Sequence, residues 1–291
     1  MQEEHTMKQI TVIGLGIIGS IWARHYISDG YAVRVWNRTP KPDFPGWEED
    51  LAKAVESSEV VHICVADPPA VAAVLQKILP ALPVGTLVIQ SSTISPEASK
   101  FFSEQCRQEG FAYVEAPFTG SKPAAEARQV VFFLGGEKKT RGQAEGVLQG
   151  LAKKFFHFSS GEKSAAIKLA MNLQIAAISQ ALTEGLSLAR QYGLGEGEFF
   201  PVLEANVAHS GLADLKRPKL EARDYTPQFS VKHMGKDLGL ALEAIKEGEL
   251  PQLRRTWEIY QKGLQKGLGD MDFIALEQLL TDKTKFQPLS E

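Results

Sequence analysis

The sequence predicts an α/β domain followed by an all-helical domain, and two observations support this. From Gln9 to Ser160, short β-branched or aromatic runs alternate with helical stretches. After Gly161 the strand pattern stops, and helical periodicity continues almost to the C-terminus. A chain of 291 residues exceeds one ordinary domain of about 150 residues. We therefore predict domains at 1–161 and 162–291, joined by a long helix.

Seven runs in the first half have the composition of strands. They are ITVIG, VRVWN, VVHICV, TLVIQSS, FAYVEAP, VVFFLGG and FFHFS. Apolar runs without alternation are typical of parallel strands buried on both faces. The early runs are far enough apart for crossover helices, whereas the last runs follow too quickly, so some strands are expected to pair antiparallel.

Five helices are predicted in the second half, at 164–192, 196–208, 232–247, 251–267 and 272–280. The first begins near Lys163 and is the most apolar long stretch of the chain. It nevertheless contains Lys168, Asn172, Gln180 and Glu184, which a lone membrane span rarely tolerates. We interpret it as a buried helix that joins the two domains.

Composition excludes several classes of function. The net charge is −3 and the 32 Lys and Arg residues are dispersed, so no basic face for nucleic acid is expected. Cys64 and Cys106 are the two cysteines, and neither they nor the six histidines have metal-ligand spacing. The polar, acidic start of the chain does not resemble a signal peptide. We expect a cytoplasmic protein with reduced thiols, no metal and no membrane partner.

A glycine motif directly follows the first predicted strand. ITVIGLGIIG places Gly14, Gly16 and Gly19 in a GxGxxG pattern that opens the first βαβ unit. The turn needs a residue without Cβ, the pyrophosphate needs close backbone approach, and the helix must pack on its strand. This predicts a Rossmann-type dinucleotide-binding domain, with the cofactor held by Gly14, Leu15, Gly16, Ile17, Ile18 and Gly19.

The end of the second strand favours NADPH over NADH. An NAD enzyme usually has an acidic residue there for the ribose 2′-hydroxyl, whereas this chain has Asn37, Arg38 and Thr39. The Arg38 guanidinium is suited to a 2′-phosphate, with Asn37 and Thr39 as neutral donors. The alternative is an arginine that only faces solvent in a turn before Pro40.

A lysine and an asparagine share one face of the long helix. Lys168 and Asn172 are four residues apart in KLAMN, among apolar neighbours. A lysine in such a position usually extends to solvent or pairs with a carboxylate, so the spacing alone leaves a structural role open.

Five separated motifs together resemble the β-hydroxyacid dehydrogenase family, which includes 3-hydroxyisobutyrate dehydrogenase and the glyoxylate and succinic semialdehyde reductases. The motifs are GLGIIG, SSTISP, EAPFTGSKPAAE, KLAMN and FSVKHMGKDLGLA, and the resemblance extends from about Lys8 to Leu280. It implies a homodimer or homotetramer and a small carbonyl or hydroxy acid as substrate.

The resemblance also implies roles for individual residues. Lys168 is expected to act as general acid/base, and Asn172 to orient the substrate. Thr93 is expected near the nicotinamide, and the loop after the third strand near the adenosine half. The loop after the third strand consists of Val65, Ala66 and Asp67. The substrate carboxylate is expected to bind Thr119, Gly120 and Ser121. From the helical domain, Phe229, Lys236 and Asp237 are expected to close over the nicotinamide and the substrate.

These residue types suit carbonyl reduction. Hydride transfer to a carbonyl carbon places negative charge on its oxygen, which an ammonium can neutralise while delivering a proton. Apolar surroundings are expected to lower the pKa of Lys168 toward the working range. Backbone N–H groups and hydroxyls of Thr119, Gly120 and Ser121 can hold a carboxylate without an arginine.

The chain departs from the family pattern at two positions. Gln90 stands where an aspartate is usual, and Thr119 where a serine is usual, so a slightly reshaped pocket is expected. GSKPAAE is more similar to the GSKKPAE of the glyoxylate and succinic semialdehyde reductases than to the GGxxGA of the hydroxyisobutyrate enzymes. For Lys122 two roles stay open, a contact with a second carboxylate or exposure to solvent.

The favoured interpretation is therefore an NADPH-dependent reductase of a small aldehyde acid. Two alternatives use the same scaffold, a hydroxyisobutyrate-type dehydrogenase and a promiscuous imine reductase. Imine reductases as a family generally lack a lysine at position 168. An alternative of another class is a sensor module that binds NADPH without turnover.

Overall fold

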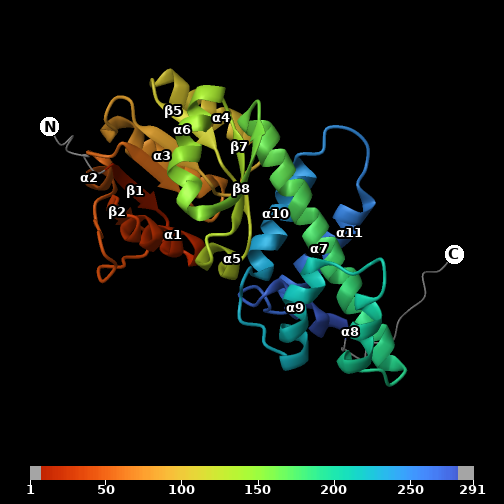
Figure 1. Cartoon of the computed structure of the whole chain (residues 1–291). Helices are drawn as coiled ribbons and strands as arrows, with labels where there is room; N and C mark the ends of the chain where they lie inside the picture. The colour runs from red at the N-terminus through yellow and green to blue at the C-terminus, as the bar shows by residue number, and fades with distance from the viewer. Residues whose placement is uncertain (1–7, 281–291) are drawn as a thin grey trace. The chain divides into compact units, whose positions relative to one another are not determined.

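The computed structural model describes residues 8–280, which form two compact units (Figure 1). The first unit ends at Ala170 and the second begins at Met171. The first contains a mostly parallel sheet with helices, and the described part of the second is helical. The predicted fold class, a Rossmann-type domain followed by an all-α domain, is confirmed.

One sheet runs through the first unit in the order β2-β1-β3-β4-β5-β7-β6, with β8 paired to β7. The first five strands in this order are parallel, and β7 is antiparallel to both β5 and β6, as expected for the closely spaced strands. The strands are β1 (Gln9–Ile13), β2 (Ala32–Trp36), β3 (Val60–Ile63), β4 (Leu87–Gln90), β5 (Ala112–Glu115), β6 (Phe118–Thr119), β7 (Val130–Gly135) and β8 (Ala152–Phe158). Only the short β6 was not predicted.

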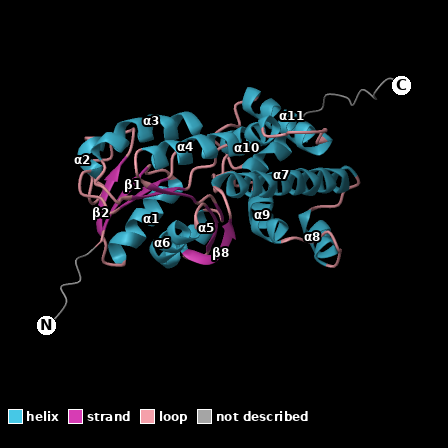
Figure 2. Cartoon of the chain, turned by 90° about the horizontal axis from the view of Figure 1, so that it is seen from above, coloured by secondary structure: helices cyan, strands magenta, loops and turns pink. Residues whose placement is uncertain are grey.

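Helices cover both faces of this sheet (Figure 2). On one face lie α1 (Ile17–Ser28), α5 (Lys122–Glu126) and α6 (Lys138–Leu148), and on the other lie α2 (Leu51–Val55), α3 (Pro68–Ile78) and α4 (Pro96–Gln108). Single-turn 3-10 segments follow α3 (Leu79–Ala81) and α6 (Gln149–Leu151). Adjacent strand residues face opposite layers: Ile89 packs in the α1 core and Val88 in the α3 core. This explains the apolar runs without alternation.

Helix α7 (Gly161–Gln191) belongs to both units, because the division falls inside it. It is long and apolar enough to cross a membrane by length and composition, and it carries the buried polar residues Lys168, Asn172 and Gln180. The second unit adds α8 (Glu196–Glu204), α9 (Gly211–Ala222), α10 (Val231–Glu243), α11 (Pro251–Gln265) and a 3-10 helix (Phe273–Leu280). Their apolar side chains form two cores.

Two features of the helical unit differ from the predictions. Helix α9 was missed because Pro218 interrupts its pattern, but Ser210 accepts a hydrogen bond from the Ala213 N–H at its start, and Ala213 and Leu220 are buried. Tertiary burial therefore outweighs the poor helix propensity of proline. The last predicted α-helix is a 3-10 helix, Phe273–Leu280.

Candidate active site

The glycine loop after β1 is shaped by contacts within the first unit. Gly14 has a φ of +102°, and a Cβ there would lie 2.2 Å from the carbonyl oxygen of Cys64. A Cβ on Gly19 would lie 1.9 Å from the carbonyl oxygen of Gly14. No larger residue fits at either position, so the loop stays in contact with the end of β3 and α1 stays close to its strand.

Gly16 is different, because a Cβ there would meet no protein atom within 4 Å. It is the N-cap residue of α1, and no side chain caps this helix start. The loop also lies where β1 has β2 on one side and β3 on the other, the switch point at which open α/β sheets bind ligands. Free space, uncapped N–H groups and this location fit a dinucleotide pyrophosphate.

The turn after β2 braces the glycine loop. Asn37 Oδ1 accepts a hydrogen bond from the Leu15 N–H at 2.8 Å, and its Nδ2 donates to the carbonyl oxygen of Thr39 at 2.8 Å. The Asn37 amide, expected as a donor to a 2′-phosphate, is thus engaged within the protein. Arg38 and Thr39 are exposed, and the ribose-phosphate function expected there stays a prediction for these two.

Lys41 is a further cation at this turn that the sequence analysis missed. Its Nζ donates to the carbonyl oxygen of Leu15 at 2.5 Å, although it lies 26 residues further along the chain. The Pro-Lys-Pro sequence gave no sign of this contact. Lys41 adds a positive charge directly beside the glycine loop.

The loops after β3 and β4 hold the other predicted cofactor residues of this unit. The Val65 N–H donates to the Ser92 hydroxyl at 2.8 Å, which ties the two loops together next to Thr93. Asp67 is the N-cap of α3, and its carboxylate accepts from the Ala70 N–H at 2.8 Å. A structural role therefore accounts for Asp67, and Ala66 lies between it and Val65.

Close packing at its first turn positions helix α7. A Cβ on Gly161 would lie 3.1 Å from Glu115 Cβ, so the helix starts directly against the end of β5. The Ser164 hydroxyl donates to the carbonyl oxygen of Gly161 at 3.0 Å. Lys168 follows four residues later on the same helical face.

Lys168 is 8% exposed, and its Nζ lies 5.7 Å from the centroid of the Phe118 ring. Such a distance is within the range of a cation–π contact. Phe118 directly precedes Thr119 on β6, and Gly120 follows with a φ of +131°. The structure thus brings the predicted proton donor next to the predicted carboxylate loop, whose last member, Ser121, is the N-cap of α5.

Lys122, for which two roles were open, is half-exposed and lies 3.7 Å from the Glu126 carboxylate, four residues away. A surface pair of this kind is weak.

In the second unit, three predicted residues form one polar group. Asn172 Nδ2 donates to Asp237 Oδ2 at 2.6 Å, and Lys236 Nζ pairs with Asp237 Oδ1 at 2.8 Å. Asn172 and Asp237 are each 1% exposed. Phe229 precedes α10 and stacks on the His233 ring.

A buried ion pair that the sequence analysis missed holds the segment containing Phe229. Lys216 Nζ lies 2.8 Å from Asp272 Oδ1, and both side chains are fully buried. Asp272 Oδ2 also accepts from the Gln228 N–H at 2.9 Å, and the Phe273 N–H donates to the carbonyl oxygen of Phe229 at 3.0 Å. Lys216 and Asp272 are 56 residues apart, so no local sequence pattern indicated this pair.

Glu115 is a buried acid at the end of β5, next to the first turn of α7. Burial raises its pKa from 4.5 to about 8, against the opposing effect of hydrogen bonds from Tyr113 and Gln90. The folded protein therefore binds a proton that the unfolded chain releases above pH 4.5. This contribution to stability is complete below pH 4.5 and is lost as the pH rises through about 8.

We expect Glu115→Gln to flatten this pH dependence, since an amide stays neutral. In the wild type, protonation of Glu115 should contribute about 4–5 kcal/mol to the free energy of unfolding, and this contribution is lost between pH 4.5 and about 8. The figure uses about 1.4 kcal/mol per pKa unit. Urea unfolding at intervals from pH 5 to 9 measures it. Equal slopes against pH for the two proteins would contradict the assignment of a neutral buried acid.

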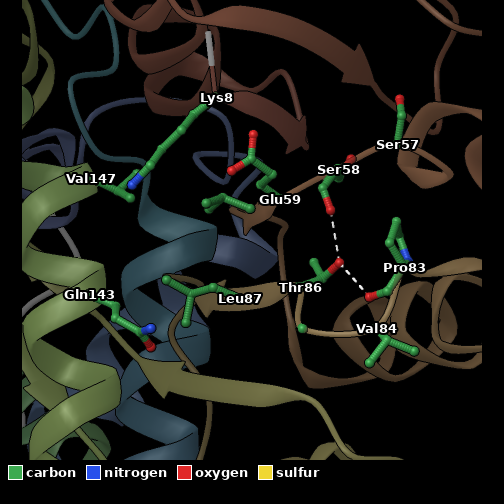
Figure 3. A pocket seen from close by; sticks show the side chains of 12 residues that line it. Lys8, Ser57, Ser58, Glu59, Pro83, Val84, Thr86, Leu87, Gln143 and Val147 are labelled. Carbon is green, nitrogen blue, oxygen red and sulfur yellow. Dashed lines mark hydrogen bonds between the residues drawn. The ribbon is translucent and has the colours of Figure 1, made fainter. Parts of the chain in front are cut away.

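A separate pocket of about 320 Å³ lies at the amino-terminal ends of the parallel strands, whereas the glycine loop follows their carboxyl ends (Figure 3). Lys8, Ser58, Glu59 and Thr86 line it, just before β1, β3 and β4 begin. The Thr86 hydroxyl is 2.8 Å from the carbonyl oxygen of Ser58. The pocket thus lies away from the glycine loop. Among residues 8–280 no group of His, Cys, Asp and Glu suits a metal ion.

Comparisons with known proteins agree with this geometry. The family model for the NAD-binding domain of 6-phosphogluconate dehydrogenase matches residues 9–159, and that for NAD-binding of NADP-dependent 3-hydroxyisobutyrate dehydrogenase matches residues 163–280. Glyoxylate/succinic semialdehyde reductase 1 of Arabidopsis thaliana is 29% identical over 279 residues, covering 92% of this chain and 96% of that protein. A probable 3-hydroxyisobutyrate dehydrogenase-like protein of the same plant is 30% identical, covering 92% and 84%.

Solved structures show the same fold. The Mycobacterium tuberculosis 3-hydroxyisobutyrate dehydrogenase with L-serine has a TM-score of 0.85 at 25% identity, covering 95% of this chain and 100% of that one. An imine reductase from Pseudomonas sp. has a TM-score of 0.63 at 21% identity, covering 94% and 99%.

The matched family models and the named relatives, together with the glycine loop, identify an NAD(P)-dependent oxidoreductase that acts on hydroxyl or carbonyl groups. Within this class, the chain belongs to the β-hydroxyacid dehydrogenase family.

Proposed function

We propose that the protein reduces a small aldehyde acid, of the glyoxylate or succinic semialdehyde type, to its hydroxy acid with NADPH. The observation that carries this proposal is the buried Lys168 amine beside Phe118 and the Thr119–Ser121 loop, in the unit that also contains the glycine loop. Two Arabidopsis relatives, 29% and 28% identical, are named glyoxylate/succinic semialdehyde reductases.

When bound, NADPH supplies the hydride. The Lys168 ammonium neutralises the charge that develops on the substrate oxygen and delivers a proton to it. Burial of the Lys168 side chain, which is 8% exposed, limits access of water to the amine and strengthens this interaction. In the reverse direction the neutral amine accepts the proton from the hydroxy acid.

The substrate carboxylate is assigned to Thr119 at the end of β6 and to the loop that follows it. Hydroxyls of Thr119 and Ser121 and the backbone N–H groups of the loop provide neutral donors. Gly120 has the positive φ that turns the chain here. We assign the orientation of the substrate to Asn172, whose side chain is held by its hydrogen bond to the Asp237 carboxylate. Phe229 and Lys236 are assigned to contacts with the nicotinamide and the substrate.

The preference for NADPH is assigned to Arg38, which is exposed in the turn after β2. We expect Arg38→Ala to raise the KM for NADPH by about 10-fold or more, because a charge-assisted phosphate bond of about 1.5–3 kcal/mol is lost. The KM for NADH should change little. Steady-state kinetics with both cofactors measure this, with the exposed Arg107→Ala as control. A similar increase for both cofactors would remove the argument.

One panel of initial rates tests the proposed function. NADPH and NADH are compared with glyoxylate, succinic semialdehyde, methylmalonate semialdehyde, tartronate semialdehyde and a cyclic imine. Turnover of the first two with NADPH supports the proposal. Turnover of methylmalonate semialdehyde or the imine alone would replace it with a hydroxyisobutyrate-type or an imine reductase. Tight NADPH binding without any turnover would indicate a sensor.

A further inference from the structure

Gln90 clamps the turn that follows β4. It is the last residue of that strand and is fully buried. Its Oε1 accepts a hydrogen bond from the Ser92 N–H at 2.5 Å, and its Nε2 donates to the carbonyl oxygen of Ser92 at 2.9 Å. One carboxamide therefore satisfies both backbone polar groups of Ser92 and fixes the direction in which the chain continues to Thr93.

The clamp extends to the neighbouring loops. The Ser92 hydroxyl accepts a hydrogen bond from the Val65 N–H at 2.8 Å, so the turn after β4 holds the loop after β3. The carbonyl oxygen of Cys64, one residue earlier, is in contact with Gly14 of the glycine loop. Gln90 thus begins a series of contacts that joins the loops after three adjacent strands of the sheet, β4, β3 and β1.

Glu115 on the neighbouring strand β5 holds the Gln90 side chain by a hydrogen bond. Gln90 Nε2 donates to Glu115 Oε1 at 2.7 Å, and the Tyr113 hydroxyl lies 2.8 Å from Glu115 Oε2. The fully buried Glu115 accepts a neutral donor well. An aspartate at position 90, usual in the resembled pattern, would bring a second carboxyl toward Glu115, and ionised it would have no donor for the Ser92 carbonyl. The amide supplies a donor and an acceptor without charge.

We propose that Gln90 is a positioning residue of the dinucleotide site, which acts by holding the Ser92 turn and, through the Ser92 hydroxyl, the Val65 loop in the conformation that receives the cofactor. The inference rests on the proposed use of NADPH. Because Gln90 acts through backbone groups of other residues, its loss affects cofactor binding more than the identity of the substrate.

Three variants test the proposal by the Kd of NADPH, measured from the fluorescence of the bound dihydronicotinamide, and by thermal unfolding. We expect Gln90→Leu, similar in shape and without polar groups, to raise Kd about 10-fold, a change of about 1.4 kcal/mol. Ser92→Ala keeps the clamp but cuts the link to Val65, and it should raise Kd by a smaller factor. Thr86→Val removes a buried hydroxyl at the other end of β4, which donates to the carbonyl oxygen of Ser58 at 2.8 Å, and it should leave Kd unchanged.

These outcomes separate positioning from general stability. If Gln90→Leu and Ser92→Ala both bind NADPH like the wild type, or if Thr86→Val weakens binding as much as Gln90→Leu, the proposal is wrong. If Gln90→Leu does not fold, Ser92→Ala decides. Failure of the wild-type protein to bind either NADPH or NADH would instead overturn the proposed function.

Discussion

Replacement of Lys168 by alanine should lower kcat by about 10²- to 10⁴-fold, the contribution typical of a positioned acid or base. The amine is buried beside Phe118, and no other lysine of helix α7 shares this environment, because Lys163 is exposed. Cofactor affinity should remain nearly unchanged, because the glycine loop and the turn after β2 are not touched. Stopped-flow and steady-state rates with NADPH, together with its Kd, measure both quantities.

Lys163→Ala is the matched control for this prediction. Lys163 lies on the same helix, is exposed and donates to the Ser159 hydroxyl at 3.1 Å. Its removal should leave kcat within about twofold, since surface contacts of this kind contribute little. An unaltered kcat in Lys168→Ala would end the assignment of that residue as proton donor.

Replacement of Asp272 by alanine should destabilise the protein by about 3–5 kcal/mol, because it leaves a buried ammonium without its partner. Lys216 is fully buried, its Nζ lies 4.3 Å from the centroid of the Phe273 ring, and besides Asp272 it donates to the neutral Gln228 Oε1 at 3.2 Å. Burial already lowers the pKa of Lys216, and the attraction of Asp272 opposes this shift. Without Asp272 the ammonium keeps the neutral Gln228 Oε1 as an acceptor but has no counter-charge, and the Gln228 N–H loses its acceptor.

Urea unfolding at neutral pH measures this loss, and Lys232→Ala serves as its control. Lys232 also pairs with an aspartate, Asp270, at 2.5 Å, but both side chains are exposed. An exposed pair contributes about 0–1 kcal/mol. Comparable losses in the two variants would show that the burial of the Lys216 pair has no energetic consequence.

The local features of the site could be read from the sequence. Gly14 and Gly19 are required by backbone contacts that recur wherever a strand, a tight turn and a helix succeed one another, so their spacing directly after the first predicted strand predicted the loop. Lys168 and Asn172 were predicted to share a helical face because four residues complete about one turn. The assignment of substrate and cofactor roles to these residues remains a prediction.

Other features could not be predicted, because they join distant positions. Gln90 and Glu115 are 25 residues apart, and each by itself reads as a polar residue at a strand end. Lys216 and Asp272 come from a helix that Pro218 concealed and from a segment expected to be α-helical. Lys41 lies between two prolines, and its sequence neighbours do not indicate its contact with Leu15, 26 residues earlier. Only folding determines which of these groups become partners.

The sequence by itself determined the order of an α/β domain and a helical domain, the glycine loop and the spacing of Lys168 and Asn172 on one helix, because hydrophobic periodicity and backbone sterics are local properties of the chain. The tertiary structure alone decided which buried polar groups pair, since a buried donor or charge is stable only beside a specific acceptor that arrives from another strand or helix. For this protein, those pairings hold the loops and the Phe229 segment on which the proposed chemistry depends.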